Sequence, residues 1–247
     1  MWSTENSYTL GGALTLDAST LGAETISGPD HFFQGQVAGV LMFNRALGPD
    51  ECLGIAKGKT FSYLDSLVSW WDMSTINPPD IGFRNLGNDG VGTGLVAATD
   101  IVNGIGGGLG MEFDAAGEYV TVPHDSSLNV GGGGFSMSVW VKVNTLGVHK
   151  GVFSKLTGDD GYTLYFWTDD TLYWRVDAAN ARSHTFGGAG VSIGRWYHVV
   201  VTHDGANTSE LYVDGVLATG GTGVGTVTAV TDDLILGMRT AAGLDGV

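Results

Sequence analysis

The most regular pattern of apolar and polar positions in this chain lies in residues 195–217 and has the character of strands. Residues 196–202 are aromatic and β-branched without helical spacing. Residues 203–207 are a cluster of turn formers, and residues 211–213 return as a second apolar run. Residues 199–201 are three consecutive valines, so both faces of that strand should be covered. The pattern predicts a β-hairpin at the centre of a sheet.

Short apolar runs separated by glycine and aspartate turns fill most of the remaining chain. Residues 36–43 read as a strand in which the bulkier set, beginning at Val37, should face the core. Residues 48–51 place proline and acids where a short helix begins. The chain has 247 residues with 41 glycines and only 5 prolines. This composition favours an all-β protein of many short strands, arranged as one large domain or two small ones.

The charge balance narrows the classes of partner. The formal net charge is −15, and the 11 basic residues are scattered along the chain. Nucleic acid and anionic membrane surfaces bind clustered lysine and arginine, so neither is expected as a partner. Residues 1–20 lack the features of a signal peptide, and no apolar run is long enough to insert into a membrane. The single cysteine, Cys52, allows no internal disulfide.

Two motifs resemble a known family. The hairpin sequence WYHVVVTHDG…LYVDGVL in residues 196–217 resembles the signature hairpin of LamG-like modules, which are laminin-G or concanavalin A-like jelly rolls. Residues 33–51, FQGQVAGVLMFNRALGPDE, resemble the end of such a module. The resemblance implies an all-β, two-sheet antiparallel jelly-roll sandwich with one short helix after the N-terminal strand. It implies function only loosely, because proteins with this sandwich fold have many different functions.

The order of these motifs is unusual for the family. Residues 1–57 resemble the C-terminal strands and short helix of a LamG-like module, whereas residues 66–247 resemble a jelly roll that lacks its own last strand. Residues 7–12 and 233–238 look like the same strand present twice. The chain is therefore either a piece of a tandem array or a permuted single domain. We expect residues 36–43 to dock into the 66–247 sheet, within the chain or from a neighbouring copy, because a missing strand leaves open edges.

The strongest candidate for a binding surface is the aromatic stretch of residues 162–174. Tyr165, Trp167 and Trp174 form a candidate stacking platform for sugar rings, with Asp169 placed to bind hydroxyls. The alternative is that these aromatics are core and sheet-surface residues. Trp140 and Trp196 lie in apolar strands and are expected in the core.

The sequence contains weaker evidence for metal binding or catalysis than for an aromatic binding surface. The resemblance implies a structural calcium ion held by main-chain oxygens and an acid in the last strand, but Ala38 occupies the position of that acid. Asp114 lies near the loop where the ion would bind. Glu112, Glu118 and Glu210 are isolated in sequence, and no alternating acids of a sandwich glycanase appear.

The sequence thus predicts a non-catalytic binding or adhesion module. Its expected partner is a glycan or cell-surface polysaccharide, with neighbouring copies of the same module as possible further partners. The expected setting is a larger extracellular, cell-surface or phage structural protein. A purely structural spacer in a virion or surface assembly, or an accessory domain of a glycan-active enzyme, remains the alternative.

Overall fold

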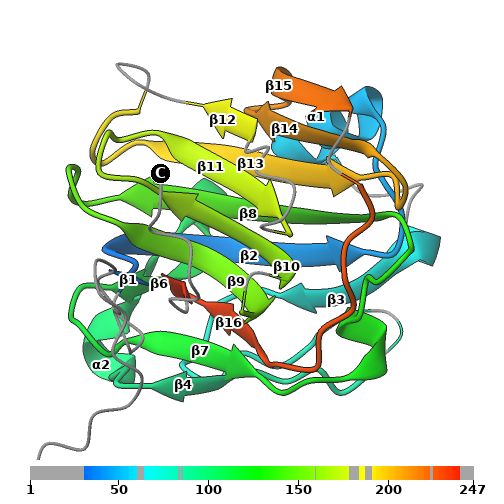
Figure 1. Ribbon diagram of the computed structural model, residues 1–247. Coiled ribbons are helices and arrows are strands. Elements are labelled where there is room, and N and C mark those ends of the chain that lie inside the picture. Colours follow the sequence, from blue (N-terminus) through cyan, green and yellow to red (C-terminus); the bar gives the residue numbers. More distant parts are fainter. Residues whose placement is uncertain are drawn as a thin grey trace, which may run out of the picture.

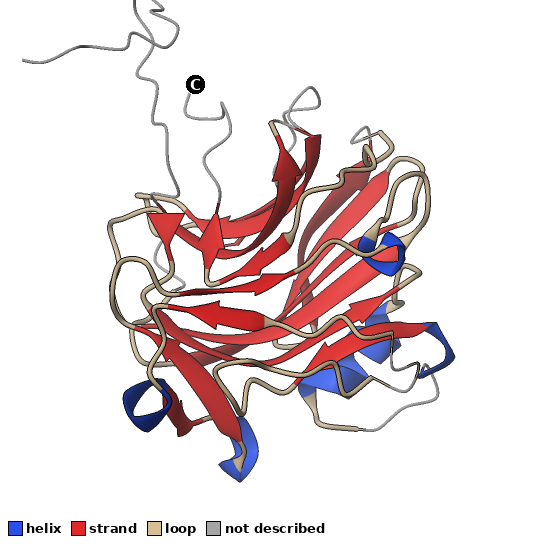
Figure 2. Cartoon of the chain, turned by 90° about the horizontal axis from the view of Figure 1, so that it is seen from below, coloured by secondary structure: helices blue, strands red, loops and turns tan. Residues whose placement is uncertain are grey.

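The computed structural model describes residues 31–59, 64–82, 84, 86–158, 160–177, 184–186, 191–222 and 225–239. Two antiparallel sheets stack face to face, with short helices at their margins (Figures 1 and 2). This arrangement confirms the expected all-β sandwich of two antiparallel sheets. The strand expected over residues 7–14 lies outside the described residues.

The larger sheet is built around the hairpin that dominates the sequence. Its order is β15 (Val216–Thr222), β14 (Thr208–Val213), β13 (Trp196–His203), β8 (Phe135–Val143), β2 (Gly35–Phe43), β6 (Leu109–Phe113) and β5 (Ile101–Asn103), and β3 (Leu67–Trp71) also pairs with β2. This is the eight-stranded sheet.

The second sheet has seven strands in the order β12 (His184–Phe186), β11 (Leu172–Val176), β10 (Asp160–Phe166), β9 (Lys150–Thr157), β16 (Leu234–Leu236), β7 (Tyr119–Val122) and β4 (Val91–Thr93). A separate two-stranded ribbon pairs β1 (His31–Phe32) with β17 (Met238–Arg239). The helical elements are α1 (Pro49–Ala56), α2 (Ala97–Asp100) and three single 3₁₀ turns at Leu64–Ser66, Ile105–Gly107 and Ser126–Leu128. No described helix is long and apolar enough to cross a membrane.

The hydrophobic core has two parts. The main core fills the space between the sheets and contains the fully buried side chains of Trp71, Phe113, Phe135 and Trp174. A smaller second core lies on the outer face of the eight-stranded sheet, where α1 covers Phe43, Leu67, Val200 and Tyr212. Val199 and Val201 face the main core and Val200 faces the second, so both faces of β13 are covered as expected.

The strand β2 lies in the interior of the eight-stranded sheet. It pairs with β8 on one side and with β6 and β3 on the other. The neighbouring ribbon brings His31 opposite Arg239. The expected docking of residues 36–43 into the sheet of the following residues is therefore present within this chain. How residues 1–57 and 66–247 divide into modules stays a prediction.

The expected facing of β2 holds for only its first half. Ala38 lies opposite Trp140 and Leu41 opposite Ser138, so β2 carries one extra residue at this point, and Gly39 adopts a φ of 54°. This β-bulge reverses the alternation. Val37 faces the main core before the bulge, whereas Leu41 faces the second core after it.

The expectation that Trp140 and Trp196 belong to the core is wrong. Both side chains are only partly buried and lie on the outer face of the eight-stranded sheet, because their neighbours Val139, Val141 and Tyr197 take the core-facing positions. The tryptophans that fill the core are Trp71 and Trp174.

Candidate functional site

The turn between β10 and β11 carries the candidate binding residues. Its backbone closes by hydrogen bonds from Trp167 N to Thr171 O (2.9 Å) and from Asp170 N to Trp167 O (3.0 Å). Asp169 Oδ1 accepts a hydrogen bond from Thr171 N at 2.9 Å, and Asp170 Oδ1 accepts one from Gly147 N. The two aspartates thus shape the turn and anchor it to the β8–β9 loop, as expected for aspartate at turn positions.

Three aromatic rings gather beside this turn. Tyr165 and Tyr173 are cross-strand partners whose rings stack at 5.4 Å with an interplanar angle of 13°. Trp167 meets both rings edge-on, at 6.2 and 6.4 Å. The Tyr173 hydroxyl donates a hydrogen bond to Asp169 Oδ2 at 3.3 Å, and burial together with the Asp169 charge raises the pKa of that phenol. We call Trp167, Tyr173 and Asp169 the turn ridge.

The Tyr165 ring packs against both aromatic rings of the turn ridge. Only 5% of its surface is exposed, and the Arg239 guanidinium lies over its ring at 4.4 Å. With Tyr173 stacked on it as well, Tyr165 has little aromatic surface left for a ligand. Trp167 packs against His149, with ring centroids 3.5 Å apart, and remains partly exposed.

The structure corrects the prediction that Trp174 contributes to the platform. Trp174 lies opposite Leu164, which faces the main core, and its side chain has no exposed surface. Its Nε1 donates a hydrogen bond to Ser209 Oγ at 2.6 Å. Tyr173, one position earlier, is the residue on the outer face. Counting cross-strand pairs back from the turn would have identified it, because partners across a hairpin share a face.

Three carboxylates converge at the end of α2 and the β6–β7 loop. Oxygens of Asp100, Asp114 and Glu118 all lie within 4.8 Å of one another. Glu118 Oε2 accepts hydrogen bonds from the backbone N–H groups of Asp114 (2.7 Å) and Ala115 (2.8 Å). Asp100 Oδ2 accepts one from Val96 N at 2.6 Å. These oxygen ligands suit a hard cation such as calcium. Glu118 is therefore not isolated in space, although it is isolated in sequence.

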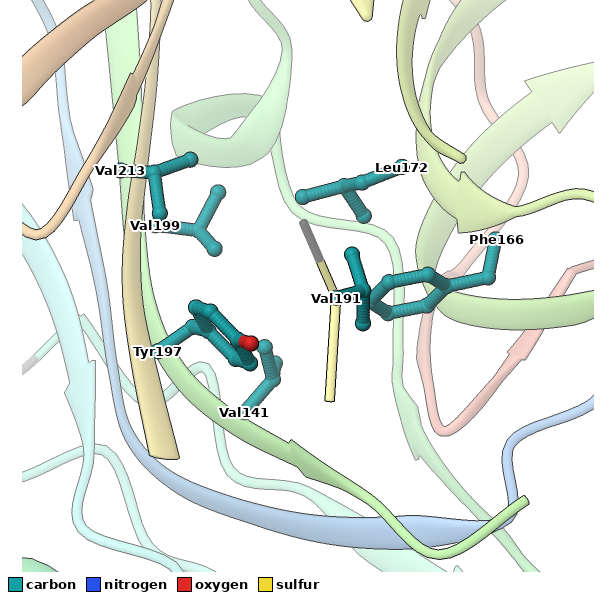
Figure 3. Close-up of a pocket in the computed structure, with 7 residues that line it drawn as sticks. All are labelled: Val141, Phe166, Leu172, Val191, Tyr197, Val199 and Val213. Atoms are coloured by element: carbon teal, nitrogen blue, oxygen red, sulfur yellow. The ribbon is translucent and has the colours of Figure 1, made fainter. Parts of the chain in front are cut away.

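One gap between the sheets is apolar and too narrow for a water molecule (Figure 3). It is lined by Val141, Phe166, Leu172, Val191, Tyr197, Val199 and Val213. This gap is therefore too small to hold a ligand.

Comparison with known proteins identifies the family. Residues 114–246 match the family model of the concanavalin A-like lectin/glucanases superfamily. The chain belongs to this superfamily. No curated protein sequence matches the chain. The superfamily assignment agrees with the two-sheet sandwich and with the position of the hairpin β13–β14 inside the matched range.

Several solved structures share the concanavalin A-like fold with this chain. The binding domain of paraclostridial mosquitocidal protein 1 has a TM-score of 0.58 at 16% identity, over 71% of this chain and 45% of that one. The binding domain of botulinum neurotoxin DC, in complex with rat synaptotagmin II, has a TM-score of 0.56 at 13% identity, over 74% of this chain and 46% of that one. The botulinum neurotoxin serotype G binding domain has a TM-score of 0.50 at 16% identity, over 66% and 41%. The chain spans less than half the length of these structures, and such identities show the fold alone.

The superfamily also includes glucanases, so the buried and half-buried glutamates are relevant. Glu112 Oε1 accepts hydrogen bonds from Gln36 Nε2 (3.1 Å) and Asn144 Nδ2 (2.8 Å). Glu210 Oε2 accepts one from the Tyr212 hydroxyl at 2.7 Å. Glu118 stabilises the loop that follows β6 by accepting hydrogen bonds from two of its backbone N–H groups. Each of these carboxylates has a structural role in the described part of this concanavalin A-like chain.

Proposed function

We propose that this chain is a non-catalytic module that binds carbohydrate, as part of a larger extracellular or phage structural protein. The observation that supports the proposal is the turn ridge, where Trp167 and Tyr173 lie partly exposed beside the exposed Asp169. The C–H face of a sugar ring packs on an aromatic side chain, and its hydroxyls donate to a carboxylate. Partly exposed aromatics held rigidly on one turn are typical of a contact surface.

The ridge is rigid enough to recognise a ligand without reorganising. Asp169 is held by Thr171 N and by the Tyr173 hydroxyl, and Trp167 is held by His149. Ordering side chains on binding costs free energy, so a preformed ridge keeps more of the contact energy as affinity.

The proposal is tested on an immobilised glycan array. Trp167→Ala and Tyr173→Ala should each lower glycan retention at least tenfold while the thermal midpoint stays near that of the parent protein. Tyr119→Ala is the matched control, because Tyr119 is a partly buried aromatic on β7 of the same sheet, away from the turn.

Three outcomes would contradict the proposal. A parent protein that binds no glycan on the array would favour the structural spacer. Ridge variants that lose retention only in proportion to lost stability would show that the rings serve packing. Retention of a glycan by the parent protein together with cleavage of that glycan would instead support an enzyme.

A further inference from the structure

A second group of aromatic residues lies on the outer face of the eight-stranded sheet. Cross-strand register pairs Trp196 with Lys142, and His198 with Trp140. Trp140 pairs in turn with Ala38, and Trp70 pairs with Leu41. Since cross-strand partners share a face, these side chains stand together on the side away from the main core.

The three tryptophans Trp196, Trp140 and Trp70 form a diagonal row across this face. They occupy β13, β8 and β3, and each lies one side-chain row further along the sheet than the one before. All three are partly exposed, whereas Trp71, the immediate neighbour of Trp70, is completely buried. We call Trp196, Trp140 and Trp70 the tryptophan diagonal.

Small residues form the floor beside Trp140. A Cβ on Gly39 would lie 3.9 Å from Trp140 Cδ1, and a Cβ on Gly110 would lie 3.3 Å from Ala38 Cβ. Ala38, Gly39 and Gly110 therefore place no long side chain beside the indole on β2 or β6. The helix α1 covers the neighbouring part of the face, over Val200 and Tyr212, and Trp70 packs against this second core.

Polar groups run along one side of the diagonal. Lys142 lies over the Trp196 ring at 5.4 Å and forms neither of the two salt bridges among the described residues. Gln36, opposite Lys142, donates to Glu112, but its buried Oε1 accepts no hydrogen bond. The partly exposed groups of this row are therefore one cation, Lys142, and one carboxylate, Glu112.

The indole N–H groups of Trp140 and Trp196 add two more donors. The structure shows no hydrogen bond from either Nε1 within the described residues, although Trp71 and Trp174 each donate from theirs. Indole N–H groups in partly buried positions ordinarily find a partner.

From this arrangement we propose that the tryptophan diagonal is a second carbohydrate-binding surface, which takes a neutral polysaccharide chain with successive sugar rings over the indoles. A protein partner would favour an apolar centre with charges at the rim. Here the partly exposed Glu112 and Lys142 lie one row from the small residues beside the rings, which suits a ligand rich in hydroxyls. The turn ridge lies on the other sheet, so the two surfaces are separate.

The test is affinity electrophoresis of the full chain through gels that contain a soluble neutral β-glucan, with alginate as the anionic comparison. The parent protein should be retarded by the β-glucan and not by alginate. Trp140→Ala and Trp196→Ala should each weaken the retardation at least tenfold, whereas Tyr119→Ala, on β7 of the other sheet and outside both surfaces, should leave it unchanged. Thermal midpoints of all variants establish that they are folded.

A conservative variant distinguishes loss of binding from loss of folding. Trp140→Phe keeps an aromatic ring and removes the N–H donor, so it should retain part of the retardation. Retardation that is absent from the parent protein, or unchanged in Trp140→Ala and Trp196→Ala, would overturn the proposal. Retardation by alginate alone would overturn the assignment of a neutral ligand. Loss of binding in Trp167→Ala only would leave the turn ridge as the functional surface and also overturn the diagonal.

Discussion

Trp174 on β11 donates a hydrogen bond from Nε1 to the Oγ of Ser209 on β14, at 2.6 Å, and so joins the two sheets through the interior of the sandwich. Ser209 in turn donates to Thr202 O at 2.8 Å. Both side chains are completely buried. Because a polar group inside a core must be paired, this bond also fixes the position of the indole between the sheets.

The two classes of tryptophan should differ in stability. Trp174→Ala should lower the free energy of unfolding by ~3–5 kcal/mol through cavity formation. Trp174→Phe keeps most of the volume but leaves Ser209 without its donor, and should cost ~1–3 kcal/mol. Trp196→Ala, on the partly exposed outer face, should cost ~1 kcal/mol. Urea denaturation midpoints measure all three, and an equal loss for Trp174→Ala and Trp196→Ala would contradict the assignment of Trp196 to the surface.

Deleting residues 1–57 should open the eight-stranded sheet. The deletion removes β2, which separates β8 from β6 and β3, and it also removes α1 from the second core. Two unpaired strand edges and an apolar strip would then be exposed, and exposed edges associate. Size-exclusion chromatography should show aggregation. Deletion of residues 1–30 alone is the control, because it leaves every pairing of β1 and β2 in place. A monomeric 58–247 fragment of undiminished stability would show that β2 is dispensable.

Acid should destabilise the protein through His198. Its side chain is completely buried, Nε2 lies 2.8 Å from Ser138 Oγ, and burial lowers its pKa from 6.5 to about 4. Between these two pH values the unfolded chain binds a proton that the folded chain does not, so stability falls as the pH decreases from about 6.5 towards about 4. The loss should reach at most ~3 kcal/mol.

The variant His198→Gln tests this pH dependence. It removes the titrating group while keeping a side chain that can bond to Ser138, so the slope of stability against pH between those values should decrease. Burial also lowers the pKa of His203, so that residue should contribute to the slope that remains. His124→Gln, on a partly exposed loop residue, is the control. An unchanged slope in His198→Gln would contradict the expectation.

Calcium should stabilise the protein if it binds the three converging carboxylates. A ligand present at 100 times its Kd raises the free energy of unfolding by ~2.7 kcal/mol. Thermal midpoints measured with calcium and with EDTA should therefore differ, and Asp114→Asn should reduce the difference. Asp50→Asn changes an exposed acid on α1 and is the matched control. Equal midpoints with calcium and EDTA in the parent protein would show that Asp114 binds no calcium.

Strand faces show where sequence reasoning succeeds and where it stops. The aromatic and β-branched run of residues 196–202, with its three consecutive valines, correctly predicted the central strand β13 and its covered faces. In β2, however, one extra residue at Gly39 reversed every later side chain. A bulge is a property of two paired strands, because it exists only as a mismatch in their register. It leaves little signal in either strand alone.

The sequence by itself determined the fold, because turn residues, strand periodicity and the two family motifs are local features. It also identified the aromatic stretch of residues 162–174 as a candidate site. Only the tertiary structure decided which aromatics face solvent. Trp174 is buried and Trp140 is not, since burial depends on which elements cover each face, and α1 covers only part of one face. The meeting of Asp100 with Asp114 and Glu118 was likewise decided by packing, because it brings the end of α2 against the β6–β7 loop.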